Sequence, residues 1–367
     1  MQEKLEEVNP VEWSDARSAL LDWYRTHQRP LPWRESPNPY HTWLCEIIMQ
    51  QTRIDQGIAY WQRFISTWPD VLSLAKSPLE EVLKAWQGLG YYSRARNLHK
   101  AAQILAFDRQ GHFPETAEEW QKIPGVGPYT AAAIASICFQ EPVPAVDGNV
   151  LRVISRFRDV REPIDRPSGR KSIEAFSRQW IHPTAPGIHN QAVMEIGATV
   201  CKPTSPRCSE CPLSDQCLNV QPESGGTPSV PIKQGKTKVK QVNLHFHVVT
   251  NGTHVWMRQR PEAGIWGGLW EFPSEEVNAL TSSPVLPHAA QAMQAPDTAI
   301  MWEEPFEHIL SHRKMRCQFI VWHTTAAFAP SEGQWLAWKS AESKPRPRAI
   351  DRFWRRLEKS CSELARR

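Results

Sequence analysis

Four cysteines within a stretch of 17 residues constrain the fold of this chain more than any other feature of its sequence. They are Cys201, Cys208, Cys211 and Cys217, and they are separated by six, two and five residues. Cysteines grouped this closely hold a zinc ion or an iron–sulfur cluster, because disulfides are rare in a reducing cytosol. A structural zinc site usually has two short ligand pairs, and only one short pair occurs here. The spacing therefore favours a 4Fe–4S cluster, with zinc or four free buried cysteines as the alternatives.

The length and composition indicate a soluble protein of two domains. The chain has 367 residues, of which 41% are hydrophobic and 22% are charged, and it is too long for one ordinary core. No stretch approaches the roughly 18 consecutive apolar residues of a membrane-spanning helix, and residues 1–7 are too polar for a secretory signal. We therefore expect a cytoplasmic protein without a membrane partner.

The first 220 residues have the periodicity of helices and almost no strand pattern. Proline and glycine separate the apolar segments, which is typical of short helices joined by stiff loops. Helices are expected over residues 14–24, 42–60, 79–86, 95–107, 116–123, 129–139 and 150–157. We predict an all-α domain over residues 1–220 that includes the cysteine loop.

The sequence changes in character after this helical part. Residues 221–240 are rich in Pro, Gly, Ser and Lys and carry no apolar period, so we predict a linker there. Apolar and polar residues then alternate over 242–249, and residues 317–323 are a second strand candidate. Residues 350–364 have a helical pattern. An α+β domain is therefore expected over residues 241–367.

Net charge does not by itself identify a binding partner. The chain carries only +4, so any site for a polyanion must be formed by particular loops. One such loop contains Gly125, Val126 and Gly127 and joins two expected helices. A glycine-rich turn before a helix exposes backbone N–H groups that can bind a DNA phosphate, as in a helix-hairpin-helix motif. An ordinary tight turn between helices is the alternative.

Two carboxylates are candidates for acid–base chemistry. Glu46 is the lone charge in the apolar stretch 43–49, and burial favours the protonated carboxyl group that a general acid needs. A buried Glu that pairs with an Arg is the alternative. Asp147 precedes an expected helix, where an Asp is also a good N-cap. A catalytic role for Asp147 therefore requires a partner, and Glu46 is the candidate.

These motifs, in this order, resemble adenine DNA glycosylases of the MutY type, which share the helix-hairpin-helix superfamily with endonuclease III. The resemblance covers residues 23–217, more than half of the chain. A weaker resemblance to the C-terminal Nudix-like domain of that family covers residues 230–357, chiefly through 264–273. The motifs that carry the resemblance in the helical part are residues 31–34, 46–52, 88–96, the glycine hairpin, residues 146–150 and the four cysteines.

The resemblance implies a monomeric base-excision enzyme that acts on double-stranded DNA. It would flip out an adenine mispaired with 8-oxoguanine, or with guanine, and hydrolyse its glycosidic bond to leave an abasic site. Glu46 would protonate N7 of the adenine and Asp147 would face the cationic sugar, as in glycosidases with two carboxylates. The resemblance also implies that Tyr129 and Asn149 assist Asp147, that Trp33, Arg34 and Glu195 hold the adenine, that Gln51 and Tyr91 wedge into the duplex, and that Thr52 and Leu89 lie near 8-oxoguanine.

Two alternatives differ in the chemistry of the helical part. Lyases of the endonuclease III type carry a Lys directly before the hairpin Thr, whereas this chain carries Tyr129. Without that amine the simplest route to strand cleavage is absent, so we expect a monofunctional glycosylase. An inert DNA-binding protein with a redox-sensing cluster would need neither Glu46 nor Asp147.

A third alternative, hydrolysis of nucleotides by the Nudix-like domain, requires clustered carboxylates around a divalent cation. Residues 274–302 carry only three acids, so we expect this domain to sense the lesion instead. Ser311 and His312 match a lesion-recognising Phe-Ser-His loop of the family and can form hydrogen bonds with 8-oxoguanine. Leu310 replaces the aromatic residue of that loop, which removes its stacking contact.

Overall fold

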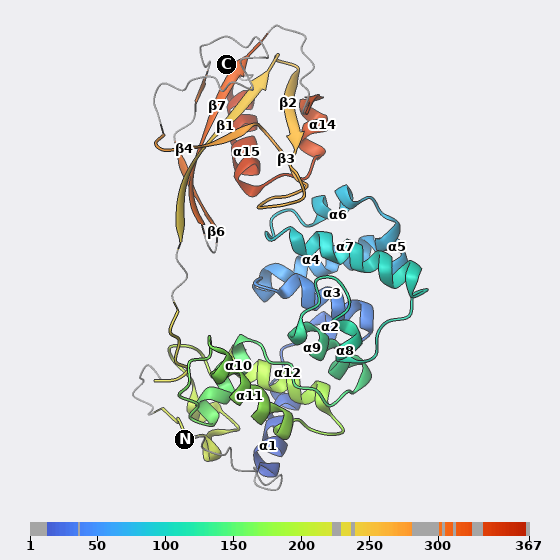
Figure 1. Cartoon of the computed structure of the whole chain (residues 1–367), viewed down its shortest axis with the longest axis vertical. Helices are drawn as coiled ribbons and strands as arrows, with labels where there is room; N and C mark the ends of the chain where they lie inside the picture. Colours follow the sequence, from blue (N-terminus) through green and yellow to red (C-terminus); the bar gives the residue numbers. More distant parts are fainter. Residues whose placement is uncertain are drawn as a thin grey trace. The chain divides into compact units, whose positions relative to one another are not determined.

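The computed structural model describes residues 13–35, 37–221, 229–235, 239–280, 301–302, 305–310, 313–324 and 333–364 (Figure 1). The chain forms two compact units. The first unit combines Met1–Ala75 with Lys100–Lys236, and the second combines Lys76–His99 with Thr237–Arg367. Within the described ranges, no helix has both the length and the apolar character needed to cross a membrane.

The first unit is built from helices, and its described residues contain no strand, in agreement with the predicted all-α class (Figure 1). Helix α7 (Ser93–Gln103) leads into this unit and continues as a π-helical turn, η1 (Ile104–Asp108). The other elements are α1 (Ser14–His27), α2 (Pro32–Glu35), α3 (Pro39–Met49), α4 (Ile54–Thr67), α5 (Val71–Lys76), α8 (Ala117–Trp120), α9 (Pro128–Phe139), α10 (Gly148–Phe157), α11 (Pro167–Trp180), α12 (Pro186–Thr199), and the short 3₁₀ turns η2 (Cys208–Glu210) and η3 (Ser214–Gln216).

One core of this unit lies between α1, α10, α11 and α12 and contains large aromatic side chains. The rings of Trp13 and Phe157 meet edge to face at 5.2 Å, and Phe157 stacks on Trp180 at 5.3 Å. Aromatic side chains bury a large area and have few rotatable bonds, so they hold the helices at fixed positions. This packing fixes the N-terminus of α10, where the candidate residue Asp147 lies.

The helix is interrupted between α3 and α4, although the sequence pattern indicates one continuous helix over residues 42–60. Gln51 adopts a left-handed conformation with φ of 57°, which interrupts helical hydrogen bonding. Both helices bury apolar residues with helical spacing. The apolar periodicity of the sequence therefore continues across the break and gives no sign of it. The prediction of a single helix is wrong, and the break exposes Gln51 at the end of α3.

The second unit contains a mixed sheet and helices, in agreement with the predicted α+β class (Figure 1). Strand β1 pairs in parallel with β7, with Phe246 opposite Phe319, and the sheet order is β3-β2-β1-β7-β5. The strands are β1 (Lys240–Thr250), β2 (His254–Gln259), β3 (Trp270–Glu271), β4 (Ser274–Val277), β5 (Met301–Trp302), β6 (Phe306–Leu310), β7 (Arg313–His323) and β8 (Gln334–Ala337), followed by helices α14 (Trp338–Ser343) and α15 (Arg348–Leu364).

Helix α15 covers one face of this sheet and forms the core with it (Figure 1). Phe319 stacks on Phe353 of α15 at 4.3 Å. Residues 76–99 belong to this unit and supply helix α6 (Leu79–Ala85) and the start of α7. Glu80 accepts a hydrogen bond from Trp270 at 3.1 Å, which ties α6 to the strand β3.

Helices α10 and α12 approach each other closely at Gly197 of α12. A Cβ atom there would lie 2.6 Å from Cβ of Asn149, so we expect Gly197→Ala to force α10 and α12 apart and destabilise the protein by about 1 to 3 kcal/mol. Gly148→Ala is the matched control, because a Cβ at Gly148 meets nothing within 4 Å. Urea denaturation of both variants measures the difference, and equal stabilities would contradict the steric argument.

Candidate active site

Glu46 lies on α3, and its carboxyl group interacts electrostatically with the hydroxyl group of Tyr129 on α9, which donates a hydrogen bond to Sδ of Met194 at 3.3 Å. The pKa of Glu46 is raised to about 7, chiefly because burial disfavours the charged carboxylate. The negative charge of Asp147 adds to this shift, whereas the Tyr129 hydroxyl group and the charge of Arg34 oppose it. A carboxyl group with this pKa is substantially protonated at neutral pH and can donate its proton.

Asp147 is the N-cap of α10, and its carboxylate accepts three hydrogen bonds. Oδ1 accepts from the backbone N–H groups of Asn149 and Val150 at 2.8 Å each, and Oδ2 accepts from Nδ2 of Asn149 at 2.7 Å. Donors at a helix N-terminus stabilise a negative charge. Asp147 therefore has both properties that the sequence suggests: it is the N-cap of α10, and its charge affects Glu46.

Glu195 lies on α12 and is completely buried between two arginines. It accepts hydrogen bonds from the backbone N–H, Nε and Nη2 of Arg29 and from Nη2 of Arg34, at 2.6 to 3.1 Å. Burial opposes the charge of Glu195, but these hydrogen bonds outweigh it, and the pKa is lowered. Glu195 therefore acts here as an anchor that orients two guanidinium groups.

Sequence reasoning missed Arg29 and Arg152, which the structure brings to this site. Arg29 lies two residues before the 31–34 motif, and its charge close to that motif was the available signal. Arg152 donates from Nη2 to Oδ1 of Asn149 and to the carbonyl oxygen of Gly197, both at 2.8 Å. Its Nε donates to the carbonyl oxygen of Cys201 at 2.8 Å. Arg152 thus connects Asn149 with the beginning of the cysteine loop.

The glycine hairpin lies between α8 and α9, as predicted. Gly125 has φ of 81°, and Gly127 is the N-cap of α9 without a side-chain hydrogen bond to the helix N–H groups. Both glycines are exposed, whereas Val126 is buried and its N–H bonds the carbonyl oxygen of Ile123 at 3.1 Å. The hairpin therefore presents backbone N–H groups to an anion at the start of α9.

The remaining sequence candidates are divided between the two units. In the first unit, Trp33 packs edge to face on Trp61 at 5.7 Å, and Thr52 lies in the break that follows α3. In the second unit, Leu89 is buried and Tyr91 is exposed with φ of 47°. Gln51 and Tyr91 share a backbone conformation that non-glycine residues rarely adopt and that occurs often at functional sites. Ser311 and His312 lie outside the described residues.

The four cysteines are free thiols that line one small cavity, together with Arg156. Arg156 is buried, and its Nη1 lies 3.3 Å from Sγ of Cys201, while the backbone N–H of Gln221 points to Sγ of Cys208 at 3.4 Å. Donors directed at sulfur atoms stabilise thiolates that bind metal. The loop therefore fits a metal cluster held by Cys201, Cys208, Cys211 and Cys217.

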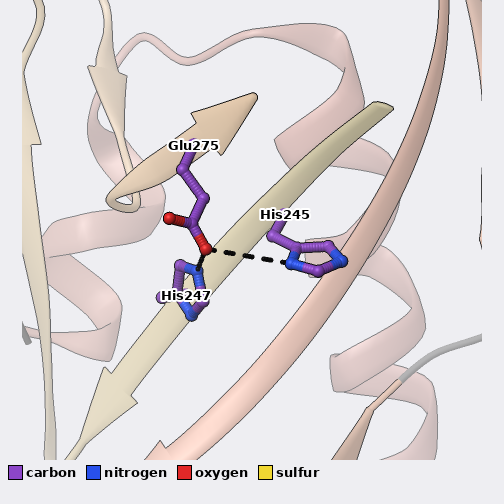
Figure 2. Close-up of side chains that lie close together, drawn as sticks. All are labelled: His245, His247 and Glu275. Carbon is purple, nitrogen blue, oxygen red and sulfur yellow. Dashed lines mark hydrogen bonds and ion pairs between the residues drawn. The ribbon is translucent and has the colours of Figure 1, made fainter. Parts of the chain in front are cut away.

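His245, His247 and Glu275 form a second group with metal-binding residue types, on strands β1 and β4 of the second unit (Figure 2). Burial lowers the pKa of His247 to about 4, so the ring is neutral at neutral pH. Trp322 donates its indole N–H to Nδ1 of His247 at 3.1 Å, which places the ring proton on Nε2. Nε2 then donates to Glu275 at 3.2 Å. The neutral His247 has no lone pair left for a metal, so this group is a hydrogen-bonded chain.

The chain matches three family models. Residues 44–182 match the HhH-GPD superfamily of base excision DNA repair proteins, residues 201–217 match the iron–sulfur binding domain of endonuclease III, and residues 245–356 match the NUDIX domain. These matches confirm both predicted fold classes. They also confirm the cofactor prediction: the four cysteines hold a 4Fe–4S cluster.

Three relatives are similar over most of the chain. The adenine DNA glycosylase of Mus musculus is 34% identical over 385 residues, which cover 88% of this chain and 74% of the mouse protein. The adenine DNA glycosylases of Homo sapiens (32% identity, 87% and 70% coverage) and Arabidopsis thaliana (33%, 89% and 61%) are comparable. A solved thermostable thymine-DNA glycosylase is 25% identical, with a TM-score of 0.50, and covers 55% of this chain and 93% of its own.

We expect Glu46 to make stability depend on pH in the direction opposite to that of an ordinary salt-bridged carboxylate. Its pKa rises from 4.5 to about 7 on folding, so the folded state binds the proton more tightly between these values. Wild-type stability should fall as pH rises from 5 to 8, relative to Glu46→Gln, by on the order of 1 to 3 kcal/mol. Urea unfolding of both proteins across this range measures the effect. A difference that does not change with pH would show that Glu46 ionises normally.

Removal of Arg156 should loosen the cysteine loop. Besides Cys201, its guanidinium group bonds the carbonyl oxygens of Lys202, Pro203 and Val230 at 2.6 to 3.0 Å. We expect Arg156→Ala to destabilise the protein by about 2 to 4 kcal/mol and to accelerate loss of the cluster to a chelator. Decay of visible absorbance measures cluster loss. Arg161→Ala, at an exposed arginine, is the control and should behave as wild type.

Proposed function

This chain belongs to the adenine DNA glycosylase family of base-excision repair enzymes, and we propose that it hydrolyses adenine from mispairs with 8-oxoguanine or guanine without cleaving the DNA strand. One observation carries this proposal: Glu46, with a pKa near neutrality, lies within the electrostatic influence of a hydrogen-bonded Asp147. A proton donor beside a fixed carboxylate is the pair that cleavage of a glycosidic bond requires.

Glu46 is the proton donor in this mechanism. An adenine flipped out of the duplex would place its N7 near the Glu46 carboxyl group, and protonation makes the neutral base a better leaving group. The Tyr129 hydroxyl group interacts with this carboxyl group from α9 and opposes the rise in its pKa. Both protonation states are accessible near pH 7, so Glu46 can give up its proton and later regain it from solvent.

Asp147 stabilises the sugar as the bond breaks. The oxocarbenium-like transition state carries positive charge, and a carboxylate already fixed by three N–H donors needs no reorganisation to meet it. Asn149 supplies two of these donors and is itself held by Arg152. Asn149 therefore positions Asp147 for attack of water or for direct stabilisation of the cation.

We propose that Arg34, Glu195 and Trp33 form the pocket that holds the adenine. Glu195 has its lone pairs engaged by Arg29 and Arg34, so we assign it the orientation of these arginines, whose remaining N–H groups can contact a purine ring nitrogen. Trp33 offers a flat aromatic surface beside them. Arg29 joins this proposed set on the basis of its contacts alone.

The absence of a lysine before the hairpin Thr supports a monofunctional enzyme. Tyr129 occupies that position, and a phenol cannot form the Schiff base of a lyase. The 4Fe–4S cluster supplies a rigid cross-link of the 201–217 loop, which presents the exposed side chain of Lys202 to a DNA phosphate.

The second unit is proposed to recognise the base opposite the adenine. Its Glu275 and Glu276 are engaged with His247 and Lys240, and its buried Glu271 pairs with Arg258 and Arg260, which leaves these carboxylates occupied. Recognition of 8-oxoguanine is assigned to Leu89, Tyr91, Ser311 and His312, with Gln51 and Thr52 from the first unit.

The proposed reaction predicts slow excision by Glu46→Gln. With enzyme in excess over a duplex containing one 8-oxoguanine:adenine pair, the variant should release adenine at least about 100-fold more slowly than wild type. Alkali treatment of the product should reveal the abasic site, and omission of alkali should leave the strand intact. Strand breaks without alkali would contradict the monofunctional assignment.

The controls separate chemistry from binding and from lesion recognition. Glu118→Gln removes an exposed carboxylate and should excise adenine at the wild-type rate. Glu46→Gln should still bind the mispair, because the groups that hold DNA are unchanged. The double variant Ser311→Ala, His312→Ala should lose about a tenfold preference for 8-oxoguanine:adenine over guanine:adenine. An unchanged preference would remove these two residues from the proposed recognition site.

A further inference from the structure

Helix α6 is attached to the C-terminal part of the second unit through polar side chains on one face. Glu80 and Lys84 lie four residues apart and therefore share this face. Glu80 accepts a hydrogen bond from Nε1 of Trp270 at 3.1 Å, and Nζ of Lys84 donates to the carbonyl oxygen of Glu342 at 2.7 Å. The partners of this helix are thus 190 and 258 residues away in the chain.

The turn that follows α6 carries residues assigned above to the mispair, and we call residues 88–91 the turn. Gly88, Gly90 and Tyr91 have positive φ angles of 104°, 75° and 47°. Tyrosine rarely adopts this conformation, which persists only where the surrounding structure holds it. The Tyr91 side chain is also 41% exposed, so its own packing does not fix its position. Contacts that flank the turn therefore decide where this ring lies.

One ion pair contacts the chain on both sides of the turn. Asp351 of α15 pairs with Arg346 at 3.2 Å, and their side chains are only 15% and 5% exposed. Directly before the turn, Nε2 of Gln87 donates to Oδ1 of Asp351 at 2.9 Å. Directly after the turn, the hydroxyl group of the buried Tyr92 donates to the carbonyl oxygen of Arg346 at 3.3 Å. The ion pair therefore connects the two ends of the turn.

The arginine of this pair is itself held from several directions. Nη1 of Arg346 donates to the carbonyl oxygens of Ala341 and Glu342 at 3.2 and 2.8 Å. Its Cζ atom also lies 4.4 Å from the centre of the Trp354 ring. A buried pair in a hydrogen-bonded network favours one geometry over its alternatives. The ends of the turn are therefore attached to a rigid part of the second unit.

We propose that Arg346 and Asp351 are positioning residues for the turn, and that through it they set the discrimination between 8-oxoguanine and guanine opposite the adenine. The inference rests on the proposed function, because it uses the assignment of this turn to the mispair. Neither residue contacts DNA in this proposal, since both act through the side chains that flank the turn. When those contacts are lost, the turn samples other conformations and Tyr91 no longer meets the mispair in one orientation.

The first test measures the order of the turn in the free protein. Loss of Arg346 or Asp351 would leave a buried charge unpaired, so the contacts are removed from the other side, by the double variant Gln87→Met, Tyr92→Phe. Hydrogen exchange of residues 86–96 should become at least about fivefold faster than in wild type, because two hydrogen bonds that hold the turn are lost. Unchanged exchange would overturn the proposal.

The second test measures discrimination between the two mispairs. With enzyme in excess, the rates of adenine release from 8-oxoguanine:adenine and guanine:adenine duplexes give the preference as a ratio. The double variant should lose about three- to tenfold of the wild-type preference. Faster exchange of the turn with an unchanged preference would overturn the positioning role.

Lys84→Met is the matched control. It removes a contact between α6 and Glu342 that does not flank the turn. Loss of its charge affects both duplexes equally and cancels in the ratio of rates. This variant should keep the wild-type preference and the wild-type exchange of residues 86–96. An equal loss of preference in this control would overturn the proposal, because general loosening of α6 would then account for the effect.

The two proposals fail in distinguishable ways. If wild type releases no adenine from either duplex, the proposed function fails, and the ratio of affinities for the same duplexes then tests the positioning role. If wild type releases adenine with a preference that the double variant retains, the proposed function stands and the positioning role fails. Assays well below the melting temperature of each variant exclude unfolding as the cause of any difference.

Discussion

The close packing of α10 against α12 is the constraint on which the candidate site depends. Gly197 allows the two helices to approach until Asn149 lies against the α12 backbone. This approach brings Arg152 within hydrogen-bond distance of Asn149, Gly197 and Cys201 at once. One guanidinium group therefore connects the residue that positions Asp147 with the beginning of the 4Fe–4S loop. The cluster loop and the Asp147 carboxylate therefore share one structural support.

The first unit shifts the pKa values of two carboxyl groups in opposite directions through their surroundings. Glu195 stays charged because two arginines surround it, although burial opposes the charge. The pKa of Glu46 is raised to about 7 because burial disfavours its charged form and the nearby charge of Asp147 adds to this effect, while the Tyr129 hydroxyl group and Arg34 oppose it. Divergent environments for similar groups are the means by which one site obtains both an acid and a fixed anchor. This contrast supports the proposal that Glu46 is the acid.

The second unit distributes its charges differently. Its buried Glu271 and partly exposed Glu275 are engaged in hydrogen bonds and ion pairs, and a tryptophan fixes the tautomer of the adjacent His247. By contrast, a cavity of this unit is lined by Arg96, Arg313 and Arg348, and none of its lining residues is acidic. The carboxylates of this unit that would bind a divalent metal are already engaged with basic side chains, so the unit suits an anionic ligand better than a metal ion. This balance favours DNA recognition over nucleotide hydrolysis.

The sequence by itself determined the fold classes, the cysteine ligands of the cluster and the position of the glycine hairpin, because each depends on local spacing or on residue type within one segment. It did not reveal the break after α3, since the apolar period continues across it. It also missed Arg29 and Arg152. Only the tertiary structure places Glu195 between two arginines 161 and 166 residues away in the chain. The raised pKa of Glu46 likewise depends on residues far apart in sequence, because burial and electrostatic potential depend on what surrounds a group in space. The same holds for the cavity of the second unit, whose lining contains no acidic residue.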